Sequence, residues 1–421
     1  MDFAAFLHAL PIPILQAPMV GASSPEMAVA VSKAGGLGAL GAGGLAPADI
    51  APAVAALRAA TDRPFGVNLF INPVAAPGAE VVDAALERLA PWYAELGAPL
   101  PAQPNDYAPD FEGQFAALVR AAPAVASFTF SILTKAQVDA LHAAGCYVVG
   151  TATTVAEARA WAAVGADGIS AQGAEAGGHR GHFLAETQAS LVGTMALVAT
   201  IRAAVDIPVI AAGGIMDGRG VAAALALGAD AVQMGTAFLL ADQTVISAPW
   251  RGALKTAGDD PTRLTRAFTG RHARGIENRF MREMREVEDE VPAYPVQNRL
   301  TQPLRAAAAK AGDAQMLSLW AGQGVRLAKV GDAGEDGQPL VGGGQAGLPG
   351  PRRTGGPLER DSLKWTPVQA TVTLQENMGE RQWRRLTWPP YRPPPATPGS
   401  SPCRWWRSPP PGPAARPTVR R

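Results

Sequence analysis

Short apolar runs alternate with longer, Ala-rich amphipathic stretches from Pro11 to about Ala241. This alternation predicts repeated βα units and a parallel sheet. Eight strands are expected, at residues 12–17, 37–41, 65–70, 126–130, 147–151, 168–173, 208–213 and 231–236. Eight such units close a TIM (β/α)8 barrel, so an α/β fold of that kind is predicted.

Residues that cap helices stand before several of the Ala-rich stretches. Ser24 and Pro25 begin one stretch, Thr134 begins another, and Thr153 or Thr154 begins a third. Side-chain oxygens at such positions accept hydrogen bonds from the unpaired N–H groups of the first helical turn. These caps support helices between the predicted strands.

Three stretches depart from the regular βα pattern. Residues 71–122 are longer than one βα unit needs and hold seven prolines, which predicts an insertion or lid after the third strand. Residues 242–329 read as mostly helical, with the charged stretch 277–295 on the surface. The last 92 residues contain 17 of the 38 prolines and 5 of the 9 tryptophans, a composition that predicts disorder.

We therefore expect a catalytic barrel domain over residues 1–329 and a disordered C-terminal tail over residues 330–421. The tail is interpreted as a solvated segment or, alternatively, as a Pro-rich ligand for a partner. The net charge of the chain is +1, but residues 1–329 hold 24 Lys and Arg against 29 Asp and Glu, so nucleic acid is not an expected partner.

Two cysteines are too few for a disulfide framework, and Cys146 is expected to be a small core residue. No uninterrupted apolar run of about 18 residues occurs, and the N-terminus lacks the basic start of a secretory signal. We expect a soluble, cytoplasmic protein without a membrane partner.

The segment Gly36-x-Gly38-x-x-Gly41 matches a dinucleotide-binding fingerprint and has Asp62 about twenty residues later. That fingerprint should follow a strand and open a helix. Here it follows a helix and forms the second strand itself, so close backbone packing is the favoured interpretation.

Small residues follow the seventh and eighth strands, in Ala212-Gly213-Gly214-Ile215 and in Gln233-Met234-Gly235-Thr236. A TIM barrel commonly binds phosphate at this position, because glycine lets backbone N–H groups approach an anion and a following helix N-terminus adds a favourable dipole. Ordinary tight turns are the alternative. Gln16, Met19 and Asn68 stand at the ends of strands one and three, where the amides would hydrogen-bond a planar polar ring or cap a turn.

His179 lies in the Gly-rich loop of residues 172–183, directly after the sixth strand. A histidine there is placed for proton transfer near neutral pH, although a histidine in a loop is often only a solvated or capping residue. Glu175, His179 and His182 do not have the spacing of a familiar zinc site, so no metal is expected. His8, His142 and His272 are interpreted as structural.

Several motifs together resemble the nitronate monooxygenases, formerly called 2-nitropropane dioxygenases. The likeness covers about residues 10–329 and includes PILQAPMVGASSPEMAVAVSKAGGLG, FGVNLF, AQGAEAGGHRGHF, PVIAAGGIMDGRG, AVQMGTAFL, GRHARGIENRF and SLWAGQG. The resemblance implies a TIM barrel with FMN and His179 as the base. It implies FMN contacts at Met19, Asn68, Gln172, Gly177, Gly214, Gln233, Met234, Gly235 and Thr236, and a place near the substrate for Ser318.

In the implied reaction an alkyl nitronate such as propionate 3-nitronate, or a nitroalkane, is oxidised with O2 to a carbonyl compound and nitrite. A monomer or homodimer is expected. The chain also resembles FMN-dependent enoyl-acyl-carrier-protein reductases through its EAGGH loop, and an NAD(P)H:quinone reductase is a further alternative. A flavin-binding or interaction protein without catalysis is the alternative from another class. The family pattern stops near Lys329, which suggests a shift of reading frame there.

Overall fold

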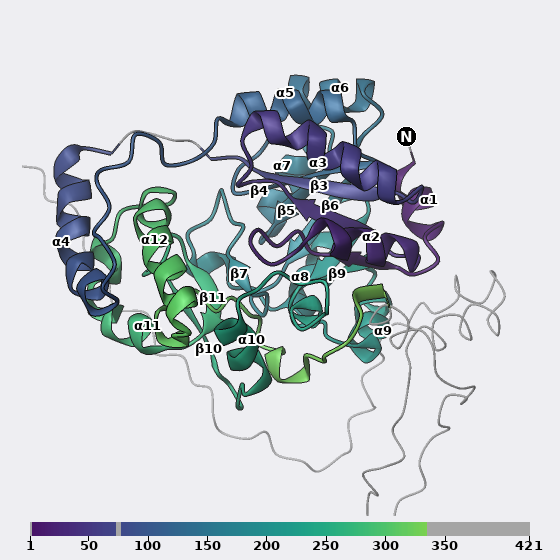
Figure 1. The fold of residues 1–421 in the computed structure, drawn as a ribbon. Helices are drawn as coiled ribbons and strands as arrows, with labels where there is room; N and C mark the ends of the chain where they lie inside the picture. Colours follow the sequence, from purple (N-terminus) through teal and green to yellow (C-terminus); the bar gives the residue numbers. More distant parts are fainter. Residues whose placement is uncertain (1, 73–76, 335–421) are drawn as a thin grey trace, which may run out of the picture. The chain divides into compact units, whose positions relative to one another are not determined.

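The computed structural model describes residues 2–72 and 77–334, and eight parallel strands form its central sheet (Figure 1). They are β1 (Ile14–Gln16), β2 (Gly38–Gly41), β3 (Phe65–Phe70), β4 (Val125–Thr129), β5 (Tyr147–Ala152), β6 (Gly168–Gln172), β8 (Val209–Ala212) and β9 (Ala231–Met234). The order runs β1-β9-β8-β6-β5-β4-β3-β2, and a parallel bridge between Leu15 and Leu37 joins the two ends. The predicted TIM barrel is confirmed, and each strand overlaps its expected range.

Helices follow the strands, and three of them begin at caps expected from the sequence. They are α2 (Pro25–Lys33), α3 (Pro47–Ala60), α5 (Phe111–Ala121), α6 (Lys135–Ala143), α7 (Val155–Ala163), α8 (Thr194–Arg202) and α9 (Gly218–Ala226). Ser24 Oγ accepts from the Met27 N–H at 3.0 Å, and Thr134 forms a capping box with Gln137. Thr154 is the cap of α7, whereas Thr153 Oγ1 donates to the Glu157 carboxylate at 2.7 Å.

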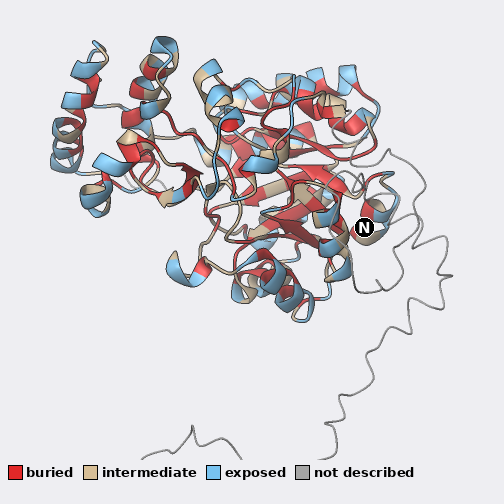
Figure 2. Cartoon of the chain, turned by 90° about the horizontal axis from the view of Figure 1, so that it is seen from below, coloured by how far each residue is buried: buried red, intermediate tan, exposed pale blue. Residues whose placement is uncertain are grey.

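The N-terminal end of the barrel is closed by the short helix α1 (Phe3–His8). Phe3 and Leu7 pack with Leu15, Val149 and Ile210 of the strands in one buried cluster. The strands are buried between this plug and the outer helices, whose exposed faces point outward (Figure 2). Substrate access is therefore limited to the opposite end, where the strands have their carboxyl ends.

The glycines of the 36–41 segment allow β2 to pack directly on α2. A Cβ added to Gly38 would lie 1.9 Å from the carbonyl oxygen of Ala28 in α2, and one added to Gly36 would lie 2.7 Å from the carbonyl oxygen of Ile14. No helix opens at this segment, because β2 itself begins at Gly38. The structure gives these glycines the packing role that the sequence favoured.

Residues 71–122 divide between the barrel and a second hydrophobic core. Helix α4 (Ala79–Glu95) packs against α12 (Val296–Ala311), away from the barrel helices in Figure 1. Helix α5 instead packs against α3 and β3, so it is the regular helix of the third βα unit. The insertion after strand three is confirmed, but it is shorter than predicted and ends before α5.

Residues 242–334 contribute most of the second core. Besides α10 (Ala248–Lys255), α11 (Arg279–Glu283) and α12, they contain the antiparallel strands β10 (Thr262–Thr265) and β11 (Ala273–Ile276). The expectation of a mostly helical region missed this pair, because two four-residue strands rich in Arg and Thr carry no clear apolar alternation. Stretch 277–295 is also not wholly on the surface, since Phe280 and Met281 are buried in the second core.

No helix within residues 2–72 and 77–334 has the length and apolar character needed to cross a membrane. The predicted tail falls almost entirely outside the described residues. Its first part is described: Gly331 forms a parallel bridge with Ala241, and Ala333 is fully buried against the barrel.

Candidate active site

A cavity of about 870 Å³ lies at the carboxyl ends of the strands, between the barrel and the second core. Predicted site residues that line it are Met19, Asn68, Gln172, Gly177, His179, Gly214, Gln233, Gly235 and Thr236. Met234 does not line it, because its side chain is buried in the barrel core. Ser318 is buried beside the cavity and accepts a hydrogen bond from Arg305 Nη1 at 3.4 Å.

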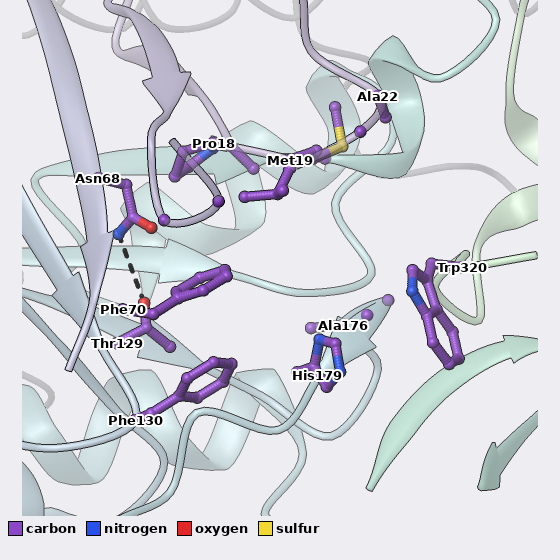
Figure 3. A pocket seen from close by; sticks show the side chains of 18 of the residues that line it. Pro18, Met19, Ala22, Asn68, Phe70, Thr129, Phe130, Ala176, His179 and Trp320 are labelled. Carbon is purple, nitrogen blue, oxygen red and sulfur yellow. Dashed lines mark hydrogen bonds between the residues drawn. The ribbon is translucent and has the colours of Figure 1, made fainter. Parts of the chain in front are cut away.

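His179 ends the short strand β7 (Gly178–His179), which pairs with β11 outside the barrel. Its ring faces three aromatic rings, with centroid distances of 5.6 Å to Phe130, 5.4 Å to Tyr294 and 5.5 Å to Trp320. In Figure 3 the His179 ring points into the cavity between Phe130 and Trp320. The base candidate therefore stands in a largely apolar wall.

Burial, followed by the charges of Arg271 and Arg305, lowers the pKa of His179 to about 3. The imidazole is therefore neutral near pH 7 and is able to accept a proton. Placing a positive charge on this ring is unfavourable unless a negative charge lies nearby. The site is thus suited to a reaction in which the proton donor becomes an anion.

Phe130 holds its position with a backbone φ of +84°, which is rare for a bulky residue. Its ring lies beside His179 and under the Arg271 guanidinium, 4.5 Å from the ring centroid. Strain of this kind persists only where surrounding contacts enforce it, and it is common at functional sites.

Backbone around Gly213 and Gly214 lines the cavity in left-handed conformations, with φ of +117° and +73°. A Cβ on Gly177 would lie 2.5 Å from the Gly322 nitrogen, so this glycine is required for close approach of two chain segments. These loops form a cradle of backbone for a ligand. The N-terminus of α9 was expected to stabilise an anion at this loop. It is already capped, because the Asp217 side chain accepts hydrogen bonds from the N–H groups of Arg219 and Gly220.

Two amide side chains remain able to contact a polar ring. Asn68 Oδ1 is buried without a hydrogen-bond partner among the described residues, while its Nδ2 donates to the Ser127 carbonyl at 3.1 Å. Gln233 Oε1 accepts from Ser170 Oγ at 2.6 Å, which leaves its NH2 group available.

Two other glutamines form hydrogen bonds within the protein. Gln172 donates to the His179 carbonyl at 3.0 Å and accepts from the Gly181 N–H at 2.8 Å, so its amide holds the histidine loop. Gln16 is fully buried inside the barrel, where its Oε1 accepts from the Ala39 N–H, and it does not line the cavity.

Sequence reasoning missed the cationic character of the cavity wall. Arg305 lines it and has a pKa lowered to about 10 by burial. Its Nη2 donates to the Asn298 carbonyl and side chain at 3.1 and 2.8 Å, and its Nε is buried with no hydrogen-bond partner in the described part of the chain. Among the described residues no Asp or Glu forms an ion pair with Arg305. A half-buried guanidinium that has no carboxylate partner in the described part of the chain favours an anionic ligand.

A metal ion has no evident site in the described part of the chain, where no group of three or more His, Cys, Asp or Glu is suitably arranged. The three side chains weighed as metal ligands in the sequence are each hydrogen-bonded to a different threonine. Glu175 Oε2 accepts from Thr194, His179 Nε2 contacts Thr269, and His182 Nε2 contacts Thr187.

A closed parallel barrel with an imidazole and glycine loops at its carboxyl end has the arrangement of a TIM-barrel enzyme, whose active site lies at that end. The model of the nitronate monooxygenase family matches residues 3–335, and the chain belongs to that family. It is 41% identical over 317 residues to a probable nitronate monooxygenase of Staphylococcus aureus, covering 75% of this chain and 89% of the relative.

Two solved structures are similar to this chain. Nitroalkane oxidase from Streptomyces ansochromogenes has 44% identity and a TM-score of 0.73, covering 79% of this chain and 96% of the other. FabK from Thermotoga maritima has 30% identity and a TM-score of 0.61, covering 80% and 93%. Together with the family match, the likeness to nitroalkane oxidase supports an enzyme of the nitronate monooxygenase kind.

Proposed function

We propose that the protein binds FMN and oxidises anionic alkyl nitronates with O2 to a carbonyl compound and nitrite. Two nitronate anions and one O2 give two carbonyl compounds and two nitrite anions, so atoms and charge balance. The observation that carries the proposal is Arg305, a guanidinium in the cavity wall that has no carboxylate partner within residues 2–72 and 77–334, beside a neutral His179. A nitronate would supply the negative charge that pairs with Arg305.

The residues present fit FMN. The unpartnered Oδ1 of Asn68 would accept from the flavin ring, and the NH2 group of Gln233 would donate to it. The backbone of Gly213, Gly214 and Gly235 would receive the phosphate. When bound, FMN supplies the one-electron redox chemistry and the reaction with oxygen, which no protein side chain here provides.

The chain's own residues handle charge and protons. His179 would remove the proton from the carbon of a neutral nitroalkane and turn it into the nitronate. Arg305 would hold the resulting oxyanion by a charge-assisted hydrogen bond. The rings of Phe130, Tyr294 and Trp320 would exclude water, which strengthens both electrostatic interactions.

The mouth of the cavity carries charges of both signs. Arg299 of α12 is exposed at the rim, and the exposed Asp106 and Asp110 lie on the segment before α5. Exposed charges are screened by salt, so the half-buried Arg305 dominates selection inside the cavity. An anionic substrate is favoured there.

The experiment compares two assays on the same protein incubated with FMN. Propionate 3-nitronate or ethylnitronate with O2 should release nitrite, and NAD(P)H should not reduce the flavin rapidly. Rapid bleaching by NAD(P)H without nitrite release would favour an enoyl-thioester or quinone reductase. Absence of both reactions from yellow protein would favour a flavin-binding protein without catalysis.

A further inference from the structure

His179 has a buried partner that does not line the cavity. Thr269 is 1% exposed, and its Oγ1 lies 2.9 Å from His179 Nε2. The same Oγ1 lies 3.1 Å from the Arg271 carbonyl oxygen and 3.4 Å from the Arg271 nitrogen. One hydroxyl group therefore meets three polar neighbours.

The hydrogen-bond count at Thr269 selects one arrangement. A hydroxyl has a single proton, and a carbonyl oxygen can only accept. If Thr269 donates to the Arg271 carbonyl, its oxygen is free to accept from His179 Nε2–H, and every group has a partner. If it donates to Nε2 instead, the Arg271 carbonyl receives no hydrogen bond from the described residues. The first arrangement is favoured because it gives every group a partner, whereas an acceptor left unpaired away from water costs about 1–3 kcal/mol.

We infer that Thr269 is a positioning residue that keeps neutral His179 in the Nε2–H tautomer, so that Nδ1 carries the lone pair that accepts the substrate proton. No described residue donates a hydrogen bond to Nδ1. After proton transfer Nε2–H still donates to Thr269, so the ring keeps its orientation. This role rests on the proposed function of His179 as the base.

The turn that carries Thr269 is held rigidly. Gly270 has φ of +80°, and a Cβ there would lie 2.0 Å from the Pro292 carbonyl oxygen, so the turn packs directly on the segment that bears Tyr294. Three residues after Gly270, β11 begins at Ala273, which is paired with His179. Arg271 Nε also donates to the Arg180 carbonyl at 2.9 Å, directly after His179.

The charged groups around the imidazole favour the neutral ring. Arg271 and Arg305 face it, and no carboxylate among the described residues is bonded to either ring nitrogen. A single neutral ring has two tautomers of similar intrinsic energy, so the hydrogen-bond partner determines which is populated. Thr269 is the partner that this structure supplies.

Histidine ¹⁵N NMR reads the tautomer directly. The protein, purified with FMN, would be labelled at both ring nitrogens of its five histidines, and the His179 signals assigned by their loss in His179→Gln. Wild type and Thr269→Ser should show a protonated Nε2 and an unprotonated Nδ1. Thr269→Val, which has no hydroxyl, should show mixed tautomers.

Turnover gives the second readout. Thr269→Val should lower kcat/KM on a neutral nitroalkane by about 10- to 100-fold and change it by less than about 3-fold on the preformed nitronate. Thr269→Ser should restore both. Thr301→Val is the matched control, since it removes another buried hydroxyl, bonded to the Phe268 carbonyl and not to His179, and it should leave the tautomer unchanged.

An Nδ1–H tautomer in wild type, an unchanged tautomer in Thr269→Val, or equal losses on both substrates would overturn the inference. Failure of the proposed function is a separate result. In that case wild type releases nitrite from neither substrate, while the NMR spectra still report the tautomer and its dependence on Thr269.

Discussion

Ala273 lies opposite His179 across the antiparallel pair of β7 and β11. The base candidate is therefore positioned by a small sheet outside the barrel, although its loop leaves the barrel at β6. Pairing to β11 fixes the backbone of His179, and the surrounding rings fix its side chain. Such double support gives a proton acceptor the precise placement that proton transfer needs.

Replacement of His179 by Ala should separate the two kinds of substrate. Neutral nitroalkanes need removal of a proton, whereas preformed nitronates do not. We expect kcat/KM to fall by about 100-fold or more on a nitroalkane and by much less on its nitronate. Steady-state nitrite release from both forms of one compound measures this. Equal losses would mean that His179 is not the base.

Arg305→Met should raise KM for an anionic nitronate. The loss of a charge-assisted hydrogen bond worth about 1.5–3 kcal/mol corresponds to a KM increase of about 10- to 100-fold. Arg299→Met is the matched control on the same helix, because Arg299 also lines the cavity but is exposed, and we expect a change below about 3-fold. Equal effects of both replacements, with folding verified by thermal unfolding, would refute a special role for Arg305.

The packing role of Gly38 gives a prediction about stability. Gly38→Ala places a Cβ against the Ala28 carbonyl and should lower the free energy of unfolding by about 1–3 kcal/mol. Gly252→Ala, in α10, meets no atom within 4 Å and should raise it by about 0.5–1 kcal/mol. Urea unfolding of both variants measures the difference. A neutral Gly38→Ala would show that α2 and β2 are less tightly packed than described.

Acid should destabilise the fold through its neutral histidines. Burial lowers the pKa of His179 to about 3 and that of His182 to about 4, whereas in the unfolded chain both are near 6.5. Below about pH 6.5 the unfolded chain binds more protons than the folded chain, so the free energy of unfolding falls as pH drops toward 4. At about pH 5 the loss should be on the order of 1 kcal/mol per histidine, reduced by partial solvent access.

Urea midpoints near neutral pH and at about pH 5 would test this linkage. His182→Gln should lose less stability between the two values than the parent, because it has one fewer group that takes up a proton on unfolding. A parent that is equally stable at both values would contradict the lowered pKa of both rings.

The barrel could be predicted from the sequence because each strand is an apolar run that is buried on both faces. Helices could be located from caps such as Ser24 and Thr134, because a cap is also a local signal that lies within a few residues of the helix start. The strands β10 and β11 were missed because their sequences, TRLT and ARGI, show no apolar alternation. The two strands pair with each other, and β11 also pairs with β7, a contact between residues about ninety positions apart.

The site residues that could be predicted from the sequence are those at or directly after the end of a barrel strand. Gln233 and Gly235 line the cavity, while Met234 between them faces the core, as the period of two in a strand requires. Arg305 and Thr269 could not be placed from sequence, since long-range packing alone brings them to His179. Gln172 lines the cavity, and its contact with the cofactor stays a prediction; its amide also holds the histidine loop, a role that the sequence did not indicate.

Equilibrium titration with FMN tests the central claim most directly. The account predicts that the purified protein binds one equivalent of FMN, with quenching of flavin fluorescence, and that Asn68→Leu weakens this binding by about 10-fold or more because a buried acceptor is lost. Protein that remains colourless after incubation with excess FMN, and that shows no quenching, would contradict the account.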